Sequence, residues 1–323
     1  MKFYSSLFFL ILLVSCVQNS HTSQLQEVKK TSEISVVVHP DFSADSALVF
    51  IEEQCAFGPR VPGSEAHKKC SDYLYGKLLD YCGEVQKQSF KTILYDGKMI
   101  DGVNLIGRLN PDMKKRVALF AHWDSRPFCD NDVEENWHKP VMGANDGASG
   151  VAVLLEVARQ LKSSGDSIGV DIVFLDLEDY GQPSFDVGEK VDTWCLGAQH
   201  LSRNFYSTVK PKWGILLDMV GGKSPYFGYD QVSLHFAENY LWKVWRNAKK
   251  LGYGNTFASK EIGAIMDDHY YLNLVASIPT IDIIDFNQER GFPDTWHTVR
   301  DVPENIEKKT LQMVGEVVLE CIR

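Results

Sequence analysis

Short apolar runs of strand length recur along the chain and alternate with segments of helical periodicity. The apolar runs predict four buried strands, at residues 117–121, 170–175, 214–217 and 278–284. Helical periodicity predicts six helices, at residues 43–55, 64–81, 150–161, 196–205, 232–251 and 304–321. Gly83 is expected to close the second helix. Because buried strands alternate with helices, we expect an α/β fold, an open, mostly parallel twisted sheet with helices on both faces.

The amino-terminal residues have the pattern of an export signal. Lys2 precedes an apolar run at residues 7–14 that is too short to span a bilayer, so residues 1–15 are predicted to be a signal peptide. The run ends in Leu-Val-Ser before Cys16, which resembles the lipobox of bacterial lipoproteins. This resemblance implies that Cys16 carries a lipid anchor and that the chain is exported to the bacterial periplasm or cell envelope membrane. The alternative is an ordinary cleaved signal with an incidental cysteine.

The rest of the chain contains no second linker. Residues 16–39 are expected to form the lipid anchor and a polar tether, and residues 40–323 a single α/β domain. The formal charge is −10, which argues against nucleic acid as a partner because phosphate binding needs a basic surface. Membrane contact is expected only through the lipid, and the protein is expected to be a monomer.

The cysteines do not have the spacing of a zinc site. After Cys16 the chain has six more and no Cys-x-x-Cys pair, so a structural thiolate site is not expected. We expect these cysteines to be small core residues. The sequence leaves open whether two of them form a disulfide.

Metal-binding side chains follow the predicted strands. These residues are His122 and Asp124, Glu178 and Asp179, Asp218, and, after a loop, His297, while Asp146 precedes a helix. Open α/β sheets bind ligands beyond the carboxyl ends of their strands, so the side chains are expected to converge there. Imidazole with carboxylates is typical of zinc enzymes that leave a coordination position open for substrate. The adjacent acids allow one carboxylate to bind metal while its neighbour transfers a proton.

Seven short motifs occur in an order that resembles a known family. They are GPRVPGS (58–64), AHWDS (121–125), GANDGASG (143–150), LDLEDYG (175–181), LLDMVG (216–221), MDDH (266–269) and WHT (296–298). The family is the one shared by co-catalytic zinc aminopeptidases and glutaminyl cyclases, and the resemblance covers residues 40–323. It implies zinc bound by Asp146, Asp179 and His297, with Glu178 as the proton shuttle. At position 179 this chain has aspartate where animal cyclases have glutamate.

The resemblance leaves two activities open. Two-zinc aminopeptidases hold a second metal at the positions of His122 and Asp218. Three features favour a cyclase with one Zn²⁺ per chain: Trp296 directly before the metal histidine, the double acid at 267–268, and the lack of an inserted accessory domain. In cyclases the residues matching Asp218 and Asp267 join a hydrogen-bonded acid network, so both are assigned catalytic roles.

The cyclase interpretation implies a substrate and further site residues. The expected substrates are peptides and proteins with an amino-terminal glutamine, which would be converted to pyroglutamate with release of ammonia. Trp296 and Trp194 are expected to form aromatic walls around the substrate, with packing in the core as the alternative role of Trp194. Residues 285–294 are expected to form a loop over the site. Asp282 stands where animal cyclases have a histidine, and is expected to act either as an acceptor near the substrate or as a buried partner of a backbone donor.

Two other functions are alternatives to the cyclase. One is a zinc aminopeptidase that uses Glu178 to activate a water molecule. The other is a lipid-anchored peptide-binding protein without catalysis.

Overall fold

The computed structural model describes residues 38–165, 168–189 and 191–323. The predicted signal peptide, Cys16 and nearly all of the predicted tether lie outside the described residues. Within the described part of the chain, no helix has the length and apolar character needed to cross a membrane.

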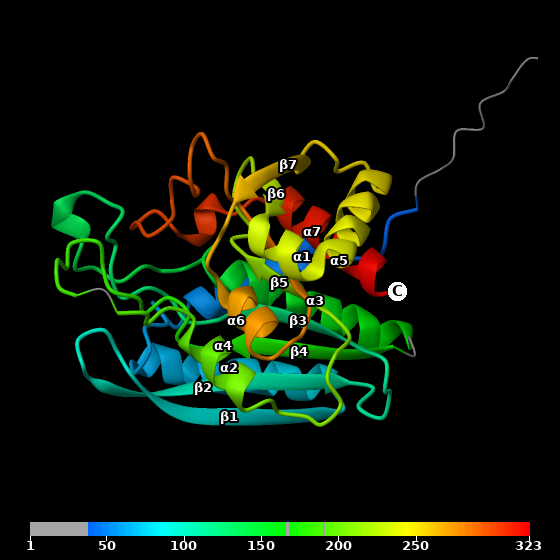
Figure 1. Ribbon diagram of the computed structural model, residues 1–323, viewed down its shortest axis with the longest axis horizontal. Coiled ribbons are helices and arrows are strands. Elements are labelled where there is room, and N and C mark those ends of the chain that lie inside the picture. Colours follow the sequence, from blue (N-terminus) through cyan, green and yellow to red (C-terminus); the bar gives the residue numbers. More distant parts are fainter. Residues whose placement is uncertain (1–37, 166–167, 190) are drawn as a thin grey trace, which may run out of the picture. The chain divides into compact units, whose positions relative to one another are not determined.

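A six-stranded mixed sheet lies at the centre of the fold (Figure 1). Its strands are β1 (Glu84–Ile93), β2 (Met99–Leu109), β3 (Arg116–His122), β4 (Gly169–Leu175), β5 (Gly214–Asp218) and β8 (Thr280–Ile284). They lie side by side in the order β1-β2-β4-β3-β5-β8. Only β2 runs against the other five strands, because it pairs antiparallel with both of its neighbours. The prediction of an open, mostly parallel α/β sheet is therefore confirmed.

The four strands predicted from apolar runs are the four that are buried along their whole length, β3, β4, β5 and β8. Their side chains face a helical layer on each side, which explains why the runs are apolar without alternation. The β1–β2 hairpin was not predicted. Most β1 residues are exposed or half-buried, so the strand lacks an apolar run.

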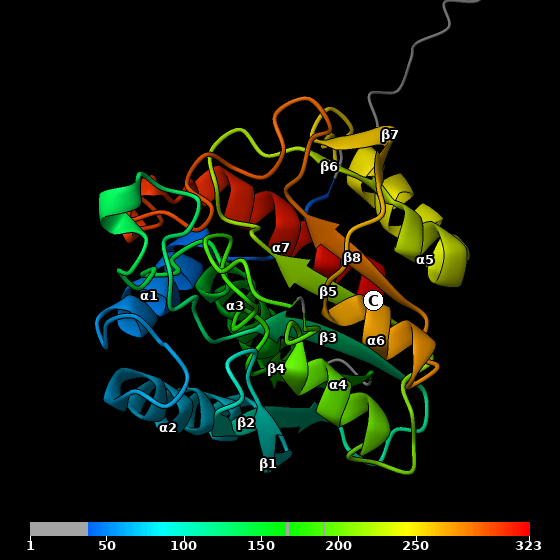
Figure 2. The ribbon, with the colours of Figure 1, turned by 60° about the vertical axis from the view of Figure 1, so that its left-hand side comes forward.

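Helices cover both faces of the sheet (Figure 2). They are α1 (Ala44–Cys55), α2 (Glu65–Tyr81), α3 (Ala148–Ser164), α4 (Leu196–Arg203), α5 (Gln231–Lys250), α6 (Asp268–Leu274) and α7 (Lys308–Ile322). Two 3₁₀ turns, Glu134–Asn136 and Pro303–Asn305, and a two-stranded sheet of β6 (Phe227–Asp230) and β7 (Phe257–Gly263) complete the described elements. Six helices match predicted ones, and α6 was not predicted because it is too short to show a period.

The capping of α2 and the start of α7 differ from the prediction for reasons that the structure shows. The residue that caps α2, Cys82, is extended, and Gly83 continues toward β1 with its N–H bonded to the Arg108 carbonyl. Gly83 therefore does not close the helix as expected. The last helix begins at Lys308 instead of residue 304, because Pro303–Asn305 forms a separate 3₁₀ turn and Glu307 caps α7.

Alternate side chains of β3 enter two separate cores. Leu119 and Ala121 belong to a large core that also contains residues of α1, α3 and α7. Ala118 and Phe120 belong to a smaller core with residues of α4 and α6. Packing on both sides fixes the sheet, and therefore fixes where its strand ends place their polar side chains.

The six described cysteines are all free thiols, and five of them are buried. They are core residues, as expected, and none of them forms a disulfide with another.

Candidate metal centre and cavity

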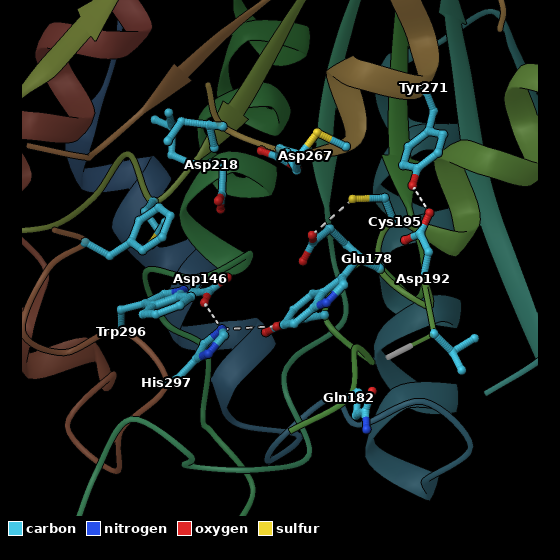
Figure 3. A pocket seen from close by; sticks show the side chains of 18 residues that line it. Asp146, Glu178, Gln182, Asp192, Cys195, Asp218, Asp267, Tyr271, Trp296 and His297 are labelled. Atoms are coloured by element: carbon cyan, nitrogen blue, oxygen red, sulfur yellow. Dashed lines mark hydrogen bonds and ion pairs between the residues drawn. The ribbon is translucent and has the colours of Figure 1, made fainter. Parts of the chain in front are cut away.

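A cavity of about 590 Å³ opens at the carboxyl edge of the sheet (Figure 3). The loops after β4 and β5 and the loop before α7 contribute to its lining. Its walls include Asp146, Glu178, Asp179, Asp218, Asp267, Trp194, Trp296 and His297. The structure therefore brings most of the predicted site residues together around one cavity.

Asp146, Asp179 and His297 lie close together although they are far apart in the chain. His297 Nε2 is 3.1 Å from an Asp179 oxygen and 3.5 Å from an Asp146 oxygen. All three side chains are buried, and one carboxylate oxygen of each aspartate has no hydrogen-bond partner. Buried carboxylate oxygens without a partner are costly unless a cation or a proton compensates them. The donor set therefore fits a divalent metal of the zinc type.

A second group of ligand atoms shares Asp146. His122 Nε2 lies 3.0 Å from Asp146 and 3.2 Å from Asp218. Burial alone would lower the pKa of His122, but hydrogen bonds with Asp124, Asp146 and Asp218 raise that pKa well above its ordinary value. The side chains expected for a second metal are thus also assembled.

Glu178 lies beside the first group and faces the cavity (Figure 3). Burial raises the pKa of the Glu178 carboxyl well above its ordinary value, and Asp179 and Asp267 add to this effect while His122 opposes it. A carboxyl with a raised pKa beside a metal site has the properties of a group that accepts and returns a proton.

Buried aspartates hold the backbone of the loops that carry the candidate metal ligands. The Asp124 carboxylate accepts hydrogen bonds from the N–H groups of Glu178 and Asp179, at 3.1 and 3.2 Å. In the same way, Asp301 accepts from the N–H groups of Asn145 and Asp146, at 2.7 and 3.1 Å. Asp301 was not identified from the sequence, because a side chain that bonds to a distant backbone has no local motif.

We expect Asp124→Ala to lower the free energy of unfolding by about 3–6 kcal/mol, because each hydrogen bond to a charged group contributes about 1.5–3 kcal/mol and two N–H groups would lose their acceptor. Chemical denaturation measures this change. The matched control, Asp101→Ala, removes an exposed aspartate and should change stability by no more than about 0.5 kcal/mol. Equal effects of the two substitutions would contradict the structural role of Asp124.

Arg126 connects His297 to an aromatic wall. Its guanidinium binds both oxygens of Asp130, at 2.6 and 2.7 Å, and the Asp179 carbonyl, at 3.1 Å. It also lies over the Trp194 ring, 4.6 Å from the ring centre. An oxygen of Asp130 in turn lies 3.5 Å from His297 Nδ1, whereas Asp146 and Asp179 lie near Nε2 of the same ring. Such a partner orients a metal-binding histidine.

Aromatic rings, including those of Trp194 and Trp296, lie beside the candidate ligands. The Trp296 ring stacks on His297 with ring centres 3.8 Å apart, and Phe292 packs against Trp296. The Trp194 ring lies parallel to His297 at 6.3 Å. Phe292 belongs to the predicted loop 285–294 and lines the cavity.

The remaining acids divide between the cavity wall and the interior behind it. Asp218 and Asp267 line the cavity, and burial raises the pKa of Asp218 to about 7. Asp282 is not among the lining residues. It is buried on β8, 3.7 Å from His269 Nδ1, so it can act on a substrate only through another residue. His269 lies between Asp282 and Asp230.

Backbone conformation is unusual around the cavity. Leu177, Cys195, Met219 and His297 all have positive φ angles, between 50° and 55°. Such conformations are unfavourable for residues other than glycine and tend to occur at functional sites, where the surrounding structure enforces them.

Comparisons with known proteins agree with this geometry. Residues 104–322 match peptidase family M28. The chain is 48% identical to the glutaminyl cyclase of Bacteroides thetaiotaomicron, whose structure was solved bound to N-acetylhistamine. The match covers 88% of this chain and 99% of that one, with a TM-score of 0.86. A structure described as a leucine aminopeptidase precursor, from Bacteroides thetaiotaomicron VPI-5482, is also 48% identical, with coverage of 89% and 99% and a TM-score of 0.85.

A more distant relative comes from cattle. The chain is 26% identical to glutaminyl-peptide cyclotransferase of Bos taurus over 248 residues, which is 67% of this chain. The match spans 64% of the length of that bovine protein.

Proposed function

Because the chain belongs to peptidase family M28, we propose that it is a glutaminyl cyclase, which converts the amino-terminal glutamine of peptides and proteins to pyroglutamate and releases ammonia. The observation that carries this proposal is Glu178, which faces a cavity between two tryptophans and beside the group of Asp146, Asp179 and His297. Similarity to a bacterial glutaminyl cyclase across nearly its full length supports it.

In this proposal one Zn²⁺ per chain is held by Asp146, Asp179 and His297. When bound, zinc supplies a Lewis acid that polarises the γ-amide carbonyl of the substrate glutamine. His122 remains a hydrogen-bond partner of Asp146 and Asp218, and does not bind a second metal.

The protein's own side chains carry the proton steps. Glu178 accepts a proton from the substrate α-amine, whose nitrogen then attacks the γ-carbonyl carbon. The same carboxyl returns the proton to the departing ammonia. Asp218 and Asp267, on the adjoining wall, form the acid network that holds the α-amine. Because nucleophile and electrophile belong to one residue, holding the reactive conformer can contribute about 7–11 kcal/mol.

The aromatic walls keep water from the reacting amide. Trp194 and Trp296 line the cavity and both stack toward the His297 ring, and water reaching the amide beside them would hydrolyse glutamine to glutamate. We further propose that the protein is an exported lipoprotein anchored through Cys16, that it acts as a monomer, and that it does not bind nucleic acid.

The aminopeptidase remains the second candidate, because His122, Asp146 and Asp218 form a group able to hold a second metal. The two candidates are separated by incubating the protein with a peptide that begins with glutamine and a matched peptide that begins with alanine. We expect ammonia from the first peptide and no free alanine from the second. Release of alanine would favour the aminopeptidase, as would about two zinc ions per chain in the active protein.

A further inference from the structure

A buried thiol lies against the proposed proton shuttle. The Sγ atom of Cys195 is 3.3 Å from Glu178 Oε1, and Cys195 is only 1% exposed although it lines the cavity (Figure 3). Asp267 lies on the same wall. This residue is 4% exposed, and its Oδ2 atom has no hydrogen-bond partner. One ligand atom from each of the three residues lies within 4.8 Å of the other two.

The backbone fixes the thiol in this position. The N–H groups of Cys195, Leu196 and Gly197 donate to the carbonyls of Glu178, Leu177 and Asp176, each at 2.9 Å. A Cβ atom at Gly197 would come within 2.2 Å of the Asp176 carbonyl oxygen, so only glycine allows the two segments to approach this closely. The segment that carries Cys195 is therefore bonded directly to the segment that carries Glu178.

We propose that Cys195, Glu178 and Asp267 form a further, thiol-containing site for a divalent cation of the Cd²⁺ or Zn²⁺ type, and that a cation bound there inhibits the enzyme. Sulfur lies about 2.3 Å and carboxylate oxygen about 2.0–2.2 Å from zinc, so ligand atoms at the observed separations reach a common ion through small side-chain rotations. Burying a carboxylate oxygen without a hydrogen-bond partner is costly, and a bound cation would offset this cost for Asp267.

The thiol determines the metal selectivity of the proposed site. Thiolate selects soft and borderline metals, whereas Mg²⁺ and Ca²⁺ prefer sites made only of oxygen. The group of Asp146, Asp179 and His297 contains no sulfur, and neither does the group around His122. Binding at the new site releases the thiol proton to solvent and is therefore distinguishable from binding at the other two.

The inhibition follows from the position of Glu178 and Asp267, and this part of the inference rests on the proposed function. Both carboxyls face the space that the substrate α-amine would occupy. A cation bound to them would exclude the amine and prevent Glu178 from accepting its proton. We therefore expect competition between the cation and the glutamine peptide, while cation binding itself requires no catalytic activity.

The test uses the full chain loaded with one equivalent of zinc and titrated with CdCl₂. We expect the ultraviolet charge-transfer absorption of a cadmium–thiolate bond to appear with one further equivalent of Cd²⁺. Over the same range the KM for a glutamine peptide should rise at unchanged kcat. Mg²⁺ and Ca²⁺ at equal concentrations should produce neither effect.

Two cysteine variants complete the test. In Cys195→Ser the absorption should disappear. Inhibition should then require a much higher Cd²⁺ concentration. Loss of a residue that only hydrogen-bonds to a metal ligand weakens binding roughly 10–100-fold, and loss of a ligand should weaken it more. Cys82→Ser, which removes a half-buried thiol elsewhere, should behave like the unchanged protein. If Cys195→Ser retains the absorption or the inhibition, the proposal is wrong.

A variant that keeps the thiol tests the site independently if Cys195→Ser fails to fold. Asp267→Asn should weaken cadmium binding at least about tenfold while circular dichroism stays unchanged, because one charged ligand is lost. Unchanged cadmium affinity in this variant would overturn the three-residue site. If the unchanged protein shows the charge-transfer absorption but does not cyclise glutamine peptides, the proposed function fails while the cation site stands.

Discussion

Replacing Glu178 with glutamine is expected to lower kcat for a glutamine peptide by about 10²–10⁴-fold, the range that a positioned acid–base group contributes. The amide has nearly the same shape as the carboxyl but cannot accept a proton from the α-amine. The expected effect is therefore on kcat, with a smaller change in KM. Ammonia release at saturating peptide, followed in a coupled assay, measures it.

The content of catalytic zinc in Glu178→Gln should equal that of the unchanged protein, because Glu178 is not one of the three proposed ligands of that zinc. Glu65→Gln, which replaces an exposed carboxyl on α2, is the matched control and should retain full activity. Normal turnover by Glu178→Gln would mean that another group moves the proton, and the mechanism proposed above would have to be abandoned.

Removal of the metal should have an effect of similar size. A Lewis acid contributes several kcal/mol, and each 1.36 kcal/mol is a factor of ten, so chelation is expected to reduce turnover at least about 100-fold. Adding about one equivalent of zinc should restore activity. The variant His297→Ala should purify with less metal and regain little activity on addition of zinc, because one of three ligands is missing.

His235→Ala is the control for the histidine variant, since His235 is an exposed residue of α5. It should keep both metal and activity. Recovery of full activity only after two equivalents of zinc would instead support two metals, with His122 and Asp218 binding the second.

Features encoded in consecutive residues were predictable from the sequence. The four central strands are apolar along their whole length because both faces are covered, so each was visible as a run. The β1–β2 hairpin lies at the edge of the sheet and has no such run. The Asp96-Gly97 turn between its strands, where Gly97 has a φ of 80°, is the local sequence signal of this hairpin. The strands β6 and β7 are short and irregular in register.

The residues of the candidate site also differ in whether consecutive sequence or contacts between distant segments determine their role. Asp146, Glu178, Asp179 and Asp218 were predictable because each lies close to the end or beginning of a recognisable element. Residues whose role depends on contacts between distant segments were not. Asp301 bonds to a backbone more than 150 positions earlier in the chain. Cys195 was expected to be a core residue, and its contact with Glu178 depends on how α4 packs against the loop after β4.

The buried guanidinium of Arg126 contacts the carboxylate behind His297, the main chain of Asp179 and the face of Trp194. One cation therefore helps to align two of the proposed zinc ligands and one side of the substrate enclosure. Lysine could not replace it, since a point charge lacks the planar fork that reaches several acceptors while lying flat on a ring. Metal affinity and substrate fit are consequently not independent properties of this protein, and a change at position 126 would alter both together.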